Sequence, residues 1–208
     1  MVTIQEISFN RSMACIHLDN GVQYWIRRKD LALCGFSEGT VTSEQNFFHW
    51  IRVYQYPQAL DYAVSMLARR PCSAGEIRSR LLYRKYTQEV VDLVMFKLEK
   101  EHLINDEEFC ELWIRSRRDR GYGPAFIRRE LKTKGLSDEI ITRGLENLNL
   151  SELQNKAVNL ARKAWKRMKA GEDIRKSRQK VIASLVRKGY SWEAARSACE
   201  EAENSPEE

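Results

Sequence analysis

Arginine and lysine gather in three separate segments of the chain. Residues 69–85 hold six basic and one acidic side chain, residues 115–134 hold eight and two, and residues 156–188 hold twelve and two. Arginine dominates the first two segments, and its planar guanidinium can donate two parallel hydrogen bonds to a phosphate or a carboxylate. Three such segments favour binding to a long anionic partner, either a nucleic acid or an acidic protein filament.

The candidate binding residues all lie in these segments. A single exposed arginine is typical of any solvated helix face, so the prediction depends on the charge segregation being repeated three times. Tyr122 lies beside Arg120 and could stack on a base, or instead pack over the start of the following helix. The candidate residues are Arg70, Arg78, Arg80, Arg84, Lys85, Arg117, Arg118, Arg120, Tyr122, Arg128, Arg129, Lys132, Lys134, Lys166, Arg167, Arg175 and Arg178.

The sequence has no recognisable catalytic or metal-binding constellation. It contains no GxxxxGKS/T, GxGxxG, GxSxG or HExxH motif. The five cysteines are widely scattered with no CxxC pair, and the three histidines lie far from one another. We therefore expect no metal site, no disulfide framework, no cofactor and no enzymatic activity.

Composition narrows the class of protein further. Of the 208 residues 43% are hydrophobic, which is enough to bury a core in one medium domain or in a series of small units. The formal net charge of +6 makes a polyanionic partner plausible. No segment approaches the ~20 apolar residues that a membrane span needs, and the N-terminus does not resemble a secretory signal. The sequence thus indicates a cytoplasmic protein without membrane contact.

The N-terminal region differs from the rest of the chain. It contains three short stretches rich in β-branched and aromatic residues, at 3–9, 13–18 and 22–26. These stretches predict a small antiparallel meander, with Asn20-Gly21 as a tight hairpin turn. From Thr42 the pattern becomes helical, and Thr42 with Gln45 has the spacing of a capping box. Pro57 is expected to start the next helix.

Beyond Pro57 nearly the whole chain is predicted to be helical, with short breaks between the helices. Most of these helices are too short to be stable alone, so they must pack on one another. Asn105 or Asp106 is expected to open one helix, which ends near Gly121, and Pro124 to be the first residue of the next. The predicted N-caps of the others are Ser73, Thr87, Ser137, Ser151 and Ser191.

The most informative feature is an internal repeat. Residues 77–81 (IRSRL) match residues 127–131 (IRREL) at a shift of 50, and the register continues without a gap through the following cap. A third copy follows at a further shift of 54, where Lys188–Ser191 corresponds to Lys134–Ser137. Each copy holds a basic helix, a tight break, a hydroxyl cap and a helix with an apolar start.

We therefore predict a mainly α fold. Three tandem three-helix repeats would form an elongated, curved body, preceded by a small N-terminal β-hairpin or meander and a helix. One compact helical domain is the alternative. In the extended form the basic segments could make a continuous positive stripe. The predicted regions are 1–56 (β-rich plus helix), 57–104, 105–150 and 151–203 (repeats one to three) and 204–208 (acidic tail). Four aromatic residues at core-like spacings are expected to be buried: Phe96, Phe109, Trp113 and Trp165.

Several short motifs occur in a characteristic order. They are Leu103-Ile104-Asn105-Asp106, Gly121-Tyr122-Gly123-Pro124, Ile127-Arg128-Arg129-Glu130-Leu131 and Lys134-Gly135-Leu136, preceded by Arg70-Pro71-Cys72-Ser73, Glu76-Ile77 and Tyr86-Thr87. In these motifs the chain resembles the RecX regulatory proteins, which modulate the bacterial recombinase RecA. The resemblance covers roughly residues 60–150, extends less sharply into the third repeat, and is loose over the first 56 residues.

The resemblance implies three tandem three-helix repeats, a cytoplasmic bacterial protein and a role other than catalysis. RecX proteins lie in the helical groove of the RecA–single-stranded DNA filament, where they limit ATP hydrolysis and strand exchange. The implied partners are a RecA-type filament and single-stranded or double-stranded DNA, and we expect a monomer. Two other classes stay open at this level: a helical transcription regulator, which is usually a symmetric dimer, and a protein–protein scaffold with no role for nucleic acid.

Overall fold

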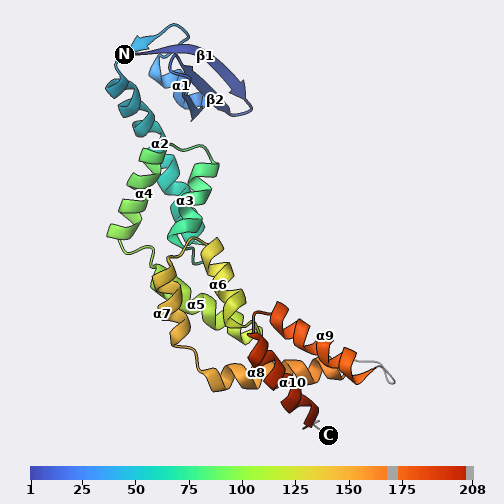
Figure 1. The fold of residues 1–208 in the computed structure, drawn as a ribbon. Helices are drawn as coiled ribbons and strands as arrows, with labels where there is room; N and C mark the ends of the chain where they lie inside the picture. Colours follow the sequence, from blue (N-terminus) through green and yellow to red (C-terminus); the bar gives the residue numbers. More distant parts are fainter. Residues whose placement is uncertain (168–172, 205–208) are drawn as a thin grey trace. The chain divides into compact units, whose positions relative to one another are not determined.

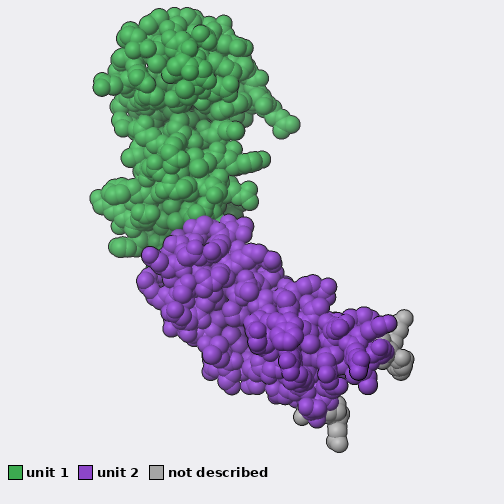
Figure 2. Space-filling model, viewed as in Figure 1, with its two compact units in different colours: residues 1–105 green, residues 106–208 purple. Residues whose placement is uncertain are grey.

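The protein is described by a computed structural model that covers residues 1–167 and 173–204. The chain divides into two compact units, residues 1–105 and residues 106–208 (Figure 1 and Figure 2). Most of the predicted acidic tail, including Glu207 and Glu208, lies outside the described residues. The prediction of a mainly α fold with three three-helix repeats and a small N-terminal sheet is confirmed.

Unit 1 begins with an antiparallel sheet in the strand order β3-β2-β1-β4. Strands β1 (Val2–Asn10), β2 (Met13–Leu18) and β3 (Gln23–Arg27) confirm the predicted meander. No element is predicted for the next segment, which holds the short helix α1 (Arg28–Cys34) and the strand β4 (Val41–Thr42). Strand β4 pairs only two residues with β1, which is too short for an alternating pattern to be recognisable.

Helix α2 (Glu44–Leu67) runs straight through Pro57, so the predicted helix start at Pro57 is wrong. The residues that α2 buries are spaced four apart: Phe47, Ile51, Gln55, Ala59 and Ala63. Burial of this continuous face outweighs the roughly 3 kcal/mol that an internal proline costs a helix. The N-cap is Ser43, whose hydroxyl accepts a hydrogen bond from the Asn46 N–H at 3.1 Å, so the predicted cap at Thr42 is wrong by one residue.

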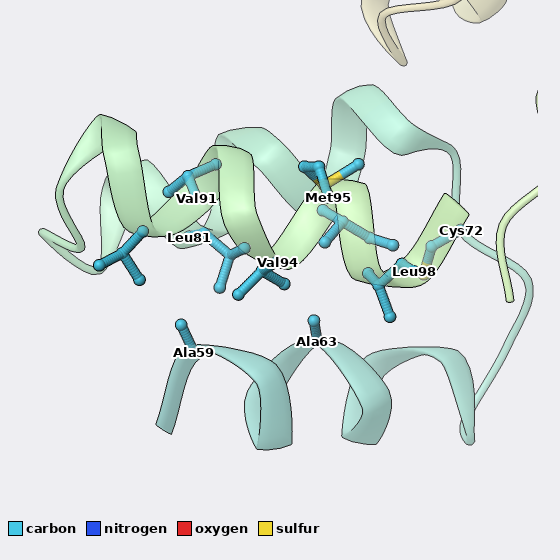
Figure 3. Packing of buried hydrophobic residues seen from close by; sticks show 10 residues of the cluster. Ala59, Ala63, Cys72, Leu81, Val91, Val94, Met95 and Leu98 are labelled. Atoms are coloured by element: carbon cyan, nitrogen blue, oxygen red, sulfur yellow. The ribbon is translucent and has the colours of Figure 1, made fainter. Parts of the chain in front are cut away.

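Helix α2 belongs to two cores (Figure 1). Its first half packs Phe47 and Ile51 against the sheet. Its second half completes the first repeat with α3 (Ala74–Tyr83) and α4 (Gln88–Lys100). Figure 3 shows Ala59 and Ala63 of α2 facing Val94 and Leu98 of α4 across this second core.

The prediction that Phe96 is buried is wrong, because 64% of this residue is exposed. The buried side of α4 is formed by Val90, Val91, Val94, Met95 and Leu98. Phe96 lies two residues from both Val94 and Leu98, which is about 200° around a helix, so it points away from this core. The other three aromatic residues do contact cores of unit 2: Phe109 is buried, and Trp113 and Trp165 are partly buried.

Unit 2 contains the second and third repeats. Its helices are α5 (Asp106–Asp119), α6 (Pro124–Thr133), α7 (Asp138–Glu146), α8 (Leu150–Trp165), α9 (Ile174–Arg187) and α10 (Trp192–Asn204). The predicted caps at Ser73, Thr87, Ser137 and Ser191 are confirmed by side-chain hydrogen bonds. The cap predicted at Ser151 is wrong, because Asn149 caps α8 and accepts from the N–H groups of Ser151 and Glu152.

The break before the last helix has the same geometry in all three repeats. Lys85, Gly135 and Gly189 occupy equivalent positions and have φ angles of 68°, 82° and 93°. In each repeat the next N–H donates to a carbonyl five residues earlier, at 3.3 Å in the first repeat and 3.2 Å in the other two. This is the hydrogen bond of a Schellman C-cap. The internal repeat seen in the sequence is therefore a repeat of backbone conformation.

Candidate nucleic-acid interface

Candidate cations in all three repeats form ion pairs with carboxylates of their own unit. The pairs are Arg70–Glu76, Arg78–Asp92, Arg117–Glu130, Arg118 with Asp119 and Glu152, Arg128 and Lys132 with Asp138, and Arg178–Glu203. The hydrogen bond from Arg78 lowers the pKa of Asp92, and the bond to Glu76 raises the pKa of Arg70. Most of these pairs are solvent-exposed, so water and salt screen them and a phosphate can compete for the cation.

The remaining cations of the first repeat are exposed. The guanidinium carbon of Arg84 lies 3.8 Å from the ring centroid of Tyr62, which holds this side chain against the surface of α2. Arg80 and Lys85 have no carboxylate partner in the part of the chain that the structure describes. The first repeat therefore presents cations to solvent, but no contact joins them into one cluster.

In the second repeat, candidate cations surround Trp113. The guanidinium carbon of Arg117 and the Nζ of Lys134 lie 4.1 Å and 4.0 Å from the centroid of its ring. Trp113 Nε1 and Arg117 Nε both donate to Glu130 Oε2, at 2.9 Å and 2.5 Å. With Arg129 and Thr133 these residues line a hollow of about 370 Å³, here called the Trp113 pocket. Three cations beside an aromatic ring and one carboxylate suit a phosphate with an attached sugar or base.

A second group of cations lies where the second and third repeats meet. Arg120, Lys156 and Lys163 line a cleft of about 220 Å³ together with Asp119. Lys156 Nζ donates to Asp119 Oδ1 at 3.0 Å, and this bond lowers the pKa of Asp119. Lys156 and Lys163 were not among the predicted site residues. Their spacing of seven residues, which places both on one side of a helix, is the indication that could have identified them.

The C-terminal end of α5 connects the two groups. Arg117, in the last turn of α5, lines the Trp113 pocket, and Arg120, the first residue after this helix, lines the cleft. We call the combined set the basic surface of unit 2. It comprises Arg117, Arg120, Arg129, Lys134, Lys156 and Lys163, and six cations there face two carboxylates. No contact within the described residues joins the exposed Lys166, Arg167 and Arg175 to this surface.

Tyr122 is partly buried and packs over the start of the following helix, which is the second of the two arrangements considered for it. Its ring stacks on Phe126 with a centroid distance of 4.2 Å and an interplanar angle of 14°. The Nζ of Lys188, from the third repeat, lies 4.9 Å from the same ring. Tyr122 therefore supports the contact between two repeats.

The residue after Tyr122 makes a backbone joint between these repeats. Gly123 N–H donates to the Lys188 carbonyl at 2.8 Å, and Ala125 N–H donates to the Gly189 carbonyl at 3.1 Å. A Cβ atom on Gly123 would lie only 2.5 Å from the carbonyl carbon and oxygen of Gly189, so any side chain at this position would force the two backbones apart. The Gly-Tyr-Gly-Pro motif thus sets the position of α6 against the end of α9.

Comparison with known proteins identifies the family. Models of the first, second and third three-helix domains of RecX match residues 59–98, 105–145 and 151–199 in that order. The Regulatory protein RecX of Listeria welshimeri is 30% identical over 198 residues, which cover 94% of this chain and 72% of that protein. The chain belongs to the RecX family.

Other RecX proteins support the same assignment. The Regulatory protein RecX of Mycobacterium sp. (strain JLS) is 32% identical over 143 residues, covering 66% of this chain and 78% of that one. A crystal structure of regulatory protein RecX superposes with a TM-score of 0.66 at 22% identity, covering 99% of this chain and 100% of that chain. The crystal structure of RecX from Lactobacillus salivarius superposes with a TM-score of 0.66 at 23% identity, covering 73% of this chain and 98% of that chain. These two structures share the fold of this RecX-family chain.

Two other kinds of site are absent from the described residues. Within residues 1–167 and 173–204, no helix is long and apolar enough to cross a membrane. The same residues contain no cluster of three or more His, Cys, Asp or Glu side chains that could hold a metal ion.

Proposed function

We propose that this RecX-family protein binds a RecA–single-stranded DNA filament and inhibits its ATP hydrolysis and strand exchange during recombination and DNA repair. Its membership of a family of regulatory proteins favours this role over a transcription regulator or a scaffold. The proposal includes a cytoplasmic location, a monomeric state and no catalytic activity of its own.

The observation that carries the proposal is the basic surface of unit 2. Its cations come from both the second and the third repeat, and the Gly123 backbone joint fixes the two repeats relative to each other. Phosphates along a nucleic acid are regularly spaced, so cations held at fixed positions can contact several of them without losing further entropy. The Trp113 pocket would hold one phosphate group, and the cleft around Arg120 another.

Inhibition follows from binding to one state of the filament. A ligand shifts an equilibrium toward the state that it binds more tightly. A protein whose cations are held at fixed positions favours one spacing of the phosphates and subunits. Filament states with a different spacing, which the ATPase cycle must visit, then become less populated. The proposed inhibitor therefore acts without touching the ATP site.

The test is the DNA-dependent ATPase rate of RecA with and without this protein. RecA is first assembled on single-stranded DNA, and the protein is then titrated in. The proposal expects the rate to fall with a saturable dose dependence. An unchanged rate, together with no co-sedimentation of the protein with the filament, would contradict it.

A further inference from the structure

Unit 1 carries an apolar groove that the proposed nucleic-acid contacts do not use. The groove lies between α2 and α4 and has a volume of about 590 Å³. Its apolar lining comes from Val53, Tyr56 and Pro57 on α2 and from Leu93 and Phe96 on α4. Val53 is 49% exposed, Leu93 37% and Phe96 64%. A group of apolar side chains that line one hollow, unlike single exposed ones, marks an interaction surface.

The core of the first repeat does not explain these residues. That core is closed by Val91, Val94 and Leu98 on the other side of α4 (Figure 3). Leu93, Phe96 and Lys100 instead follow each other at intervals of three and four residues, which places them on one stripe of the helix. Helix α4 thus carries two apolar side chains, Leu93 and Phe96, outside the face that is buried within unit 1.

Pro57 interrupts the backbone hydrogen bonding of α2 beside the same groove. Because proline has no N–H, α2 cannot supply the usual donor to the carbonyl of Val53, four residues earlier. Both residues line the groove. Helix α2 therefore lacks one of its usual backbone hydrogen bonds beside the groove.

The edge of the groove is positively charged. Arg52, Lys97 and Lys100 are part of its lining, and no acidic residue lines it within the described part of the chain. Arg52 pairs with Glu89 at 3.6 Å and Lys97 pairs with Glu101 at 2.6 Å, both in exposed positions where another carboxylate can compete. An occupant with apolar side chains and flanking carboxylates would satisfy both the lining and the edge.

We propose that this groove docks a short helical segment of the recombinase, apolar on one face and flanked by Asp or Glu. This inference rests on the proposed function, because it takes RecA as the partner. The lining residues of α4 extend over about 10 Å, enough for two turns of a bound helix with anchors at i and i+3 or i+4. A second copy of this chain fits less well, because a symmetric contact would bring Arg52, Lys97 and Lys100 against the same cations.

The experiment compares two alanine variants of the full chain in binding to RecA–single-stranded DNA filaments, at low and at high salt. Leu93→Ala/Phe96→Ala removes the apolar anchors. Tyr83→Ala is the matched control, since it removes an aromatic side chain that is 79% exposed on α3 of the same repeat. All these side chains are exposed, so both variants should fold, which circular dichroism would verify.

We expect the double variant to weaken filament binding by about tenfold or more, as when an interface hot spot is removed, and the control to change it less than about twofold. The weakening should be similar at both salt concentrations because the side chains removed are apolar. Unchanged binding of the double variant to a filament that the wild type binds would overturn the groove inference alone. Failure of the wild type to bind would instead contradict the proposed function. A wild-type dimer, or binding to anionic vesicles, that the double variant no longer shows would assign the groove to a different occupant and also overturn the inference.

Discussion

Replacing Gly123 by alanine tests the backbone joint that holds the second and third repeats together. Gly123 has φ −85° and ψ 169°, an extended conformation that alanine adopts without strain. Any effect must therefore come from contact. The new Cβ would lie 2.5 Å from the carbonyl carbon and oxygen of Gly189 and 2.6 Å from the Tyr190 nitrogen, all of them backbone atoms that no side-chain rotation can move.

The expected cost follows from what must separate. Normal contact distances require the two backbones to move apart by roughly 1 Å, which breaks the hydrogen bonds from Gly123 and Ala125 to the third repeat. Two hydrogen bonds at about 1 kcal/mol each, plus about 1–3 kcal/mol for overpacking, lower the stability of unit 2 by about 3–5 kcal/mol.

The assay is urea unfolding of the full chain, combined with amide hydrogen exchange at residues 123–126. Gly39→Ala is the control: it also places a Cβ on glycine, but with φ +81° and no atom within 4 Å. Backbone strain alone should cost that variant about 1–2 kcal/mol. The reasoning is refuted if Gly123→Ala is no more destabilising than Gly39→Ala and the amides of Gly123 and Ala125 keep their protection.

Two further substitutions test other parts of the account. The side chain of Gln55 is buried, with 2% of the residue exposed. Its Nε2 donates to the Trp25 carbonyl at 2.7 Å, and its Oε1 accepts from the Thr87 N–H at 2.9 Å. Gln55 therefore connects the sheet to the first repeat. Gln55→Ala should lower the free energy of unfolding by about 2–4 kcal/mol, because two backbone groups lose their hydrogen-bond partners. The control Gln5→Ala, at an exposed position, should leave the free energy of unfolding unchanged. Equal urea midpoints for the two variants would contradict this expectation. Lys85 has a φ angle of 68° at a position where the other two repeats have glycine. Lys85→Gly should therefore raise the free energy of unfolding by about 1 kcal/mol, because glycine adopts this conformation without strain. A lower melting temperature of the variant would contradict that expectation.

The repeated architecture was predictable because its determinants are local. Each break combines a residue with a positive φ angle, an N-cap residue with a hydroxyl group and an apolar start of the next helix, all within a few residues. These features recur in the same register in the sequence of each repeat. Helix α2 was not predictable in the same way. Its continuity through Pro57 depends on the sheet and the first repeat burying one side of the helix together, which is a tertiary effect. Exposure of Phe96 likewise depends on which side of α4 meets α2.

The candidate site was predictable by segment but not by residue. Charge counts identify the stretches that carry the cations, because charge is a property of composition. Which cations share a pocket depends on helix packing: Arg117, Arg129 and Lys134 meet at Trp113 only because α5 and α6 cross there. The structure also separates Arg128 and Lys132, which pair with Asp138, from Arg129, which has no carboxylate partner among the described residues.

The central claim is that the basic surface of unit 2 contacts the phosphates of the filament. The most direct measurement is the salt dependence of filament binding for Arg129→Glu/Lys163→Glu, compared with Arg11→Glu/Lys29→Glu. Both variants change the net charge equally, and the second pair lies on exposed positions of the N-terminal region, away from the basic segments. The account predicts weaker binding for the first variant, with the log–log salt slope reduced by about 0.7 for each phosphate that is no longer neutralised, and little change for the second. Equal affinities and equal slopes for the two variants would contradict it.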